Sequence, residues 1–148
     1  MSAAARPARH EVQIEVPRGG FVKRSADGAV QLRSPLPCPF GYGSVVGTRA
    51  EDGDPVDAVL LGRALPAGAR CSALLVGRVD FVDDGVPDHK YVFWAGEGAG
   101  PGRGEQRLVE AFFALYALVK GARARLRGPR GPTRAGPTAW SGVQLPPR

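Results

Sequence analysis

Acidic side chains are concentrated in two short segments of this chain, where together they could bind a cation. The first segment, 52–57, reads Asp-Gly-Asp-Pro-Val-Asp, and the second, 83–90, reads Asp-Asp-Gly-Val-Pro-Asp-His-Lys. Residues 51–88 hold eight of the fourteen acids of a chain whose net charge is +6. Carboxylates that lie close together repel one another unless a cation joins them, and hard divalent metals take oxygen ligands. The two segments therefore predict a divalent metal site.

The first acidic segment has a backbone suited to converging carboxylates. Gly53 permits a tight bend, and Pro55 prevents a regular helix. A calcium EF-hand loop requires glycine at its sixth position and glutamate at its twelfth. Counted from Asp52, those positions hold Asp57 and Arg63, which excludes an EF-hand. Either segment alone could equally be a solvated surface turn, and it is the presence of two, each at the end of a predicted strand, that favours a metal site.

Lysine is scarce in this chain, and two lysines are candidates for contacts with phosphate. The chain has 17 arginines but only three lysines, at positions 23, 90 and 120. An ammonium group is a compact point charge and differs from the planar fork of arginine. Lys90 follows Asp88 by two residues, so on an extended segment both side chains lie on one face. We select Lys23 and Lys90 as candidate phosphate contacts. The alternative is that these positions carry lysine by chance in an arginine-rich chain.

Short strands are expected to carry these residues. Alternating or continuous apolar runs predict strands over 11–17, 58–61, 71–82 and 91–94. A hairpin is expected from Phe21 to Leu32, because Asp27-Gly28 is a strong short-range turn signal. Three prolines and two glycines predict a loop over 34–43.

One helix is expected after the strands, from Glu105 to Lys120. Its predicted core-facing stripe has helical spacing and comprises Leu108, Phe112, Leu115 and Val119. Gly121 is expected to close the helix, since glycine is common just past a helix end. Short strands followed by one helix predict an α+β, mainly β domain, or a small β-barrel with the helix packed on it.

Length and composition predict one domain with flanking tails. The 148 residues fit a polar lead-in over 1–10, a domain over 11–121 and a tail over 122–148. Beyond Glu110 the chain has no acid, and its Arg, Gly and Pro content predicts a disordered tail. Such a basic tail could contact RNA or phosphates non-specifically, or remain solvated without a role.

The composition also bears on location. No apolar run approaches the about 18 residues that a membrane span needs, so no membrane partner is expected. Residues 1–6 lack the apolar stretch of a secretory signal. Cys38 and Cys71 form no metal motif, and a reduced pair in a cytoplasmic protein is expected.

The first acidic segment, Asp-Gly-Asp-Pro-Val-Asp, resembles the signature of the soluble family I inorganic pyrophosphatases. The resemblance extends over about 11–121. It includes the opening strand at Ile14–Pro17, a phosphate-binding lysine at Lys23, and Tyr42-Gly43 ten residues before Asp52. It also includes the spacing of the second acidic segment and an aromatic helix segment, namely Asp83, Asp88, Lys90 and Phe112–Tyr116.

This resemblance implies a fold, a cofactor and a role for each matching residue. The fold is a small OB-like five-stranded β-barrel with a C-terminal helix packed on it, and the cofactor is Mg²⁺, although Mn²⁺ also suits oxygen ligands. The implied metal ligands are Asp52, Asp57, Asp83, Asp88 and, through water, Glu15. The implied general base is Asp54. The implied phosphate contacts are Lys23, Arg33, Tyr42, Lys90 and Tyr116.

The chain departs from the family pattern mainly around the phosphates. A site glutamate is replaced by Ser25, and the lysine that follows the helix tyrosine is replaced by Ala117. An asparagine of the pattern is replaced by Gly41, and Arg33 is only the best match for the phosphate arginine. We expect Ser25→Glu with Ala117→Lys to raise turnover.

The leading prediction is an inorganic diphosphatase that uses a metal-activated water and Mg²⁺ to hydrolyse pyrophosphate to two phosphates. The alternative is a catalytically weakened relative that binds metal and phosphate, or a partner, without turnover. A third reading, an RNA-binding barrel, draws on the fold class and the basic tail alone. We expect a cytoplasmic homo-oligomer with pyrophosphate as its ligand and no nucleic-acid partner.

Overall fold

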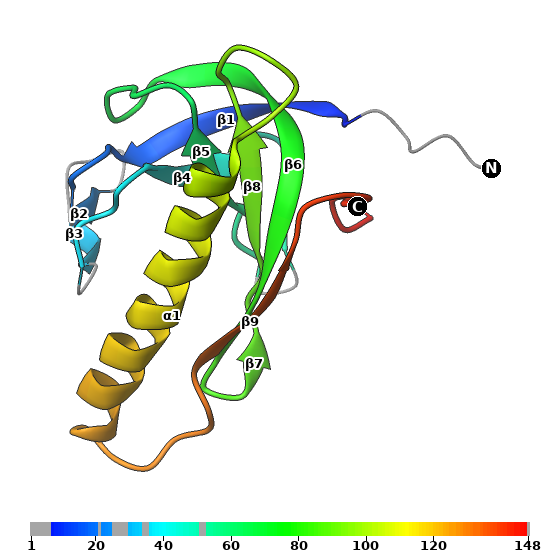
Figure 1. Cartoon of the computed structure of the whole chain (residues 1–148). Helices are drawn as coiled ribbons and strands as arrows, with labels where there is room; N and C mark the ends of the chain where they lie inside the picture. Colours follow the sequence, from blue (N-terminus) through cyan, green and yellow to red (C-terminus); the bar gives the residue numbers. More distant parts are fainter. Residues whose placement is uncertain (1–6, 21, 25–29, 34–35, 51–52, 148) are drawn as a thin grey trace.

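A computed structural model of the chain describes residues 7–20, 22–24, 30–33, 36–50 and 53–147, and for 22–24 and 30–33 it describes the backbone only. Figure 1 shows the arrangement of its strands and of the single long helix that it contains. In chain order the elements are β1 (Arg9–Val16), β2 (Val22–Arg24), β3 (Val30–Arg33), β4 (Gly41–Val45), β5 (Asp57–Leu61), β6 (Arg70–Asp83), β7 (Val86–Pro87), β8 (Lys90–Trp94), α1 (Arg103–Arg125) and β9 (Arg134–Ala139).

Five of the strands pair into a closed ring. The order is β1, β4, β5, β8 and β6, and β6 pairs again with β1. The pairs are antiparallel except for β5 with β8, which is parallel. β2 and β3 form the expected hairpin beside this ring, although Asp27-Gly28 lies outside the described residues. The predicted α+β, mainly β fold with one helix is confirmed.

The ring has two hydrophobic clusters, one on each side of its strands. Alternation along β5 sends Ala58 and Leu60 to one cluster and Val59 and Leu61 to the other. The first cluster collects residues from all five strands, as the inside of a ring does. The second contains the buried aromatic residues of α1 and lies between the ring and the helix. Both faces of β5 are therefore buried, which explains its continuous apolar sequence.

The helix differs from the prediction in its buried face and in its length. Its buried residues are Val109, Phe112, Phe113 and Ala117. Leu108 and Leu115 are 42% and 51% exposed, so the predicted stripe was wrong except at Phe112 and the half-buried Val119. Apolar residues follow two offset faces of α1, and the buried surface includes a residue of each: Phe112 and Phe113 both pack on Phe40, and Phe113 also packs on Phe81.

The helix also continues four residues past Gly121, to Arg125. A Cβ at Gly121 would lie 3.6 Å from Thr133 Cβ, so the chain beyond the helix returns along this turn. A glycine inside a helix costs only about 1 kcal/mol, so Gly121 does not by itself end a helix of 23 residues.

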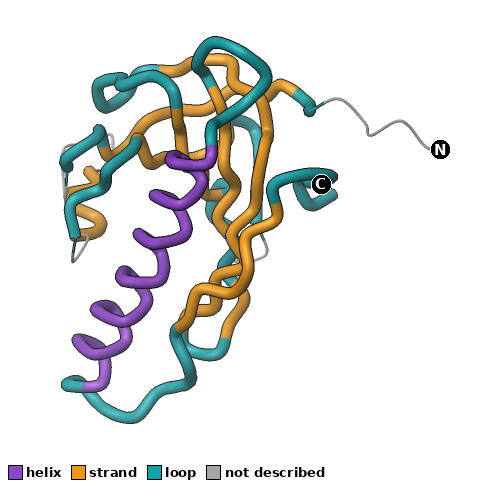
Figure 2. The backbone as a smooth tube through the Cα atoms, viewed as in Figure 1, coloured by secondary structure: helices purple, strands orange, loops and turns teal. Residues whose placement is uncertain are grey.

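The C-terminal segment is ordered where the composition predicted disorder. A loop leads from α1 into β9, which pairs with β6 from Arg78↔Ala139 to Val82↔Arg134 (Figure 2). The next residue, Trp140, donates a 2.8 Å hydrogen bond to Glu110 on the helix. Pro137 is tolerated because it lies at the irregularity of the β6–β9 pairing, between the paired residues Ala135 and Thr138. Arginine and glycine content carried no signal of that pairing.

The predicted loop 34–43 already enters β4 at Gly41. This strand lies close to β1, because a Cβ at Gly43 would collide with the Gln13 carbonyl. Both cysteines, Cys38 and Cys71, carry thiols rather than a disulfide. Within the described part of the chain, no helix has the length and hydropathy required to cross a bilayer.

Candidate functional site

A buried lysine at the start of β8 joins the two acidic segments. Lys90 is 5% exposed, and its Nζ donates to Asp57 Oδ2 at 2.7 Å and to Asp88 Oδ2 at 2.8 Å. Asp57 opens β5 and Asp88 precedes β8, and these two strands run parallel side by side. The parallel pairing therefore brings together two carboxylates that are 31 positions apart in the sequence.

The surroundings of Lys90 keep its ammonium charged. Burial lowers the pKa of Lys90, but its interactions with Tyr42, Asp57 and Asp88 outweigh burial and hold it well above its ordinary value. Burial raises the pKa of Tyr42 well above 10, although Lys90 opposes that rise. Tyr42 is therefore a neutral phenol near neutral pH, and the two aspartates supply the attraction there. The Lys90 Nζ lies 5.8 Å from the Tyr42 ring centroid and 5.6 Å from that of Phe81.

Glu15 lies two strands away from Asp57 on the same sheet. Its Oε1 accepts a 3.3 Å hydrogen bond from Ser44 Oγ, and Ser44 is the backbone partner of Asp57 in the β4–β5 pairing. Tyr42 and Ser44 are two residues apart in β4 and so share one face of it. Polar residues of β1, β4, β5 and β8 thus form a row across the outer face of the ring.

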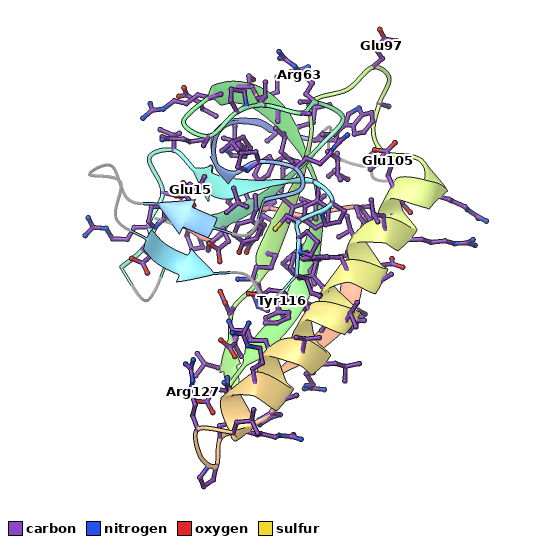
Figure 3. All side chains as sticks on the ribbon, turned by 90° about the vertical axis from the view of Figure 1, so that its left-hand side faces the viewer. Glu15, Arg63, Glu97, Glu105, Tyr116 and Arg127 are labelled. Carbon is purple, nitrogen blue, oxygen red and sulfur yellow. The ribbon has the colours of Figure 1, made fainter. Side chains whose placement is uncertain are left out.

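The helix brings Tyr116 to the same region. Figure 3 shows Tyr116 projecting from α1 toward the strands. Its ring lies 5.7 Å from that of Phe81, which also borders Lys90, and its phenol contributes to the raised pKa of Tyr42. Asp57, Asp88, Lys90, Tyr42 and Tyr116 therefore gather in one region.

Asp83 is engaged by the C-terminal part of the chain instead. Its Oδ2 accepts from Lys120 Nζ at 2.8 Å, and its Oδ1 accepts from Arg130 Nη2 at 2.5 Å and Thr133 Oγ1 at 3.1 Å. Burial raises the pKa of Asp83, but the hydrogen bonds and charges of these partners lower it below its ordinary value.

The other expected site residues are described only in part. Asp54 is exposed in the turn before Pro55, and its carbonyl accepts from the Ala50 amide at 2.7 Å. Asp52 and Ser25 lie outside the described residues. For Lys23 in β2 and Arg33 in β3 only the backbone is described.

The position after the helix tyrosine cannot accept a lysine without cost. Ala117 is 3% exposed and belongs to the cluster between α1 and the ring. A lysine there would bury a charge among apolar side chains, which is expensive unless the charge finds a partner. We therefore expect Ala117→Lys to destabilise the protein rather than to restore a phosphate contact.

The donors around Lys90 fit a divalent cation, whereas those around Asp83 do not. Asp57 and Asp88 each bind Lys90 through one oxygen, Oδ2, so the second oxygen of each carboxylate can approach a small cation. At Asp83 both oxygens already bind positive groups. Among the described residues no three His, Cys, Asp or Glu side chains come together, and Asp52 is outside that set.

Sequence reasoning missed three residues that contact the expected site residues. They are Ser44, which contacts Glu15, and Lys120 and Arg130, which contact Asp83. Lys120 is one of the three lysines, so the scarcity of lysine was a usable signal for it. Arg130 was hidden among the arginines of the basic tail, and Ser44 had no distinguishing neighbour. Their roles depend on strand pairing and on the return of the chain after α1.

The fold is that of solved inorganic pyrophosphatases. The structure aligns with the crystal structure of an inorganic pyrophosphatase from Neisseria gonorrhoeae at a TM-score of 0.67, with 25% identity over 88% of this chain and 81% of that one. The enzyme from Thermus thermophilus gives a TM-score of 0.71, with 24% identity over 94% and 86% of the two chains.

The sequence agrees with this likeness. The family model described as inorganic pyrophosphatase matches residues 12–95, and the chain belongs to that family. An inorganic pyrophosphatase of Gluconobacter oxydans is 37% identical over 89 residues, which is 55% of this chain and 51% of that protein. The chain thus spans about half the length of the curated relatives that it matches. The predicted family is confirmed.

Proposed function

We propose that this protein hydrolyses inorganic pyrophosphate to two phosphates and that it depends on Mg²⁺. The observation that supports this most strongly is the meeting of Asp57 and Asp88 at Lys90, inside the segment that the family model matches. Two carboxylates and a buried ammonium provide both a place for a divalent cation and a fixed positive charge for phosphate.

The residues divide into a metal-binding group and a phosphate-binding group. Asp52, Asp57 and Asp88 would hold the cation, with Glu15 acting through water. A divalent cation there supplies charge neutralisation of pyrophosphate and an activated water. Asp54 takes the proton of the attacking water as general base. The phosphate-binding side chains are Lys23, Arg33, Tyr42, Lys90 and Tyr116.

The protonation states of Lys90 and Tyr42 suit the binding of phosphate. Lys90 stays positively charged and Tyr42 stays a neutral hydrogen-bond donor near neutral pH, because their pKa values are both raised. Each group can then donate to a phosphate oxygen without first losing or gaining a proton. Preorganised donors of this kind stabilise charge in the transition state, at about 3–4 kcal/mol for each lost contact.

The test is phosphate release from pyrophosphate by the purified chain, with and without Mg²⁺. We expect release only with the metal, and we expect Asp54→Asn to fold normally and to lose hydrolysis. Asp80→Asn is the matched control, because Asp80 is an acid of β6 that contacts Arg78 and His89, and none of these three residues has an assigned role in hydrolysis. Undiminished release by Asp54→Asn would refute the assignment of the base.

A catalytically weakened relative that binds metal and phosphate is the second candidate. Two observations favour it: Ala117 is buried where the family pattern has a lysine, and Asp83 is bound by Lys120 and Arg130. Binding of Mg²⁺ and phosphate without hydrolysis of pyrophosphate would support this second candidate over the active enzyme. A cytoplasmic location and homo-oligomeric assembly stay predictions.

A further inference from the structure

The turn between β6 and β7 is bonded to the chain that follows the helix. The Gly85 amide donates to the Pro132 carbonyl at 2.8 Å, and the Asp84 amide donates to Thr133 Oγ1 at 3.2 Å. In the other direction, the Gly131 amide donates to Asp84 Oδ1 at 2.5 Å. These bonds immediately precede the first β6–β9 pair, so the turn lies where β9 begins.

Asp83 is the charged centre of this contact. Arg130 and Lys120 approach its two oxygens from different elements, the C-terminal segment and the last turns of α1. Lys120, Asp83 and Arg130 are 28%, 24% and 16% exposed, so water screens these charges only partly. Since the chain has no acid after Glu110, the basic residues of its C-terminal part can find carboxylates only on earlier elements.

A divalent cation would compete with these two groups for the same carboxylate. Mg²⁺ binds oxygen at about 2.0–2.1 Å, and each carboxylate oxygen offers about two acceptor positions. Both positions of Asp83 Oδ1 are taken, by Arg130 and Thr133, and Oδ2 binds Lys120. A dication on the remaining position would lie next to an ammonium group, and like charges repel strongly at such a distance.

We propose that Asp83 anchors the C-terminal segment 130–139, and that Lys120 and Arg130 occupy its carboxylate in place of a divalent cation. The anchoring stands on the contacts alone, and the statement about the cation rests on the proposed function. In this protein Asp83 is a positioning residue for β9, and the metal is held from the side of Asp57 and Asp88. The protein therefore binds one cation fewer than its acidic residues suggest.

The test combines Mn²⁺ binding, counted by electron paramagnetic resonance, with amide hydrogen exchange of residues 134–139 in the full chain. Asp83→Asn is expected to leave the Mn²⁺ count unchanged and to accelerate exchange of β9 by about tenfold or more, as the loss of a charge-assisted contact implies. Asp80→Asn, an acid of the same strand paired with Arg78, is the control and is expected to change neither.

A second variant removes the two cations and keeps the acid. Lys120→Met with Arg130→Gln frees the Asp83 carboxylate, so the variant is expected to bind one more Mn²⁺ than the wild type. Adding Asp83→Asn to this variant should abolish that gain. A lower Mn²⁺ count in the single Asp83→Asn variant, or unchanged exchange of β9, overturns the proposal. Wild-type protein that binds no Mn²⁺ defeats the proposed function, and the exchange result then decides the anchoring by itself.

Discussion

Replacing Lys90 by methionine should destabilise the protein and make its stability depend on Mg²⁺. Methionine keeps the unbranched stem of the side chain but removes the ammonium group that lies between Asp57 and Asp88. The two carboxylates then face each other without a cation. A divalent ion that binds both of them can restore the lost attraction, so the variant reports directly on the metal site.

The size of the loss follows from burial. Removing one partner of a buried ion pair costs about 3–5 kcal/mol. The side chains of Asp57 and Asp88 are 26% and 37% exposed, so water screens part of their repulsion and the lower end applies. For a chain of this size about 1 kcal/mol shifts the midpoint of thermal unfolding by roughly 2–4 °C, and we expect a decrease of roughly 6–12 °C.

The assay is thermal unfolding at neutral pH, without Mg²⁺ and with Mg²⁺ at increasing concentration. Saturating metal should restore most of the loss, since a ligand at 100 times its dissociation constant stabilises by about 2.7 kcal/mol. Arg78→Met is the matched control, because the Arg78–Asp80 pair is about one-third exposed and such pairs contribute about 0–1 kcal/mol. If Lys90→Met costs no more than this control, or if Mg²⁺ stabilises neither variant, the assigned metal site is wrong.

Three further predictions test the fold and the site. Gly43→Ala should lower the free energy of unfolding in urea by several kcal/mol, about 3 or more, because its Cβ would collide with Gln13 of β1; a loss below about 1 kcal/mol would mean that β1 and β4 can separate freely. Ala117→Lys should also unfold at a lower urea concentration than the wild type, whereas the family pattern alone predicted that this substitution, together with Ser25→Glu, would raise turnover. Since the folded-state pKa of Asp83 is lowered, its contribution to stability is present above the ordinary aspartate pKa of about 3.9 and is lost as the pH falls through the lowered value. The protection factors of the β9 amides, which correct for the slower intrinsic exchange in acid, should therefore fall as the pH is lowered in the wild type, and the fall should be smaller in Asp83→Asn.

The sequence by itself determined the fold class and the family. Alternating and continuous apolar residues located β1, β5, β6 and β8, because burial of one or both faces of a strand leaves a periodic record in the sequence. The acidic segment 52–57 identified the family, because residue type and spacing in a short turn depend on local backbone geometry alone. With the second acidic segment, the resemblance predicted Asp57 and Asp88 as metal ligands and Lys90 as a phosphate contact, and the structure brings these three side chains into contact.

The tertiary structure decided which partner each charged residue has. Two faces of α1 were apolar enough to be buried, and contact with Phe40 and Phe81 buries Phe112 and Phe113. Leu108 and Leu115 of the predicted stripe stay exposed. The ordering of the basic tail depended on β9 pairing with β6, a contact between segments about 55 residues apart that composition does not encode. Asp57 and Asp83 are both acids at strand ends in the sequence. The end of α1 brings Lys120 to Asp83 and the chain after α1 brings Arg130, whereas Asp57 binds Lys90.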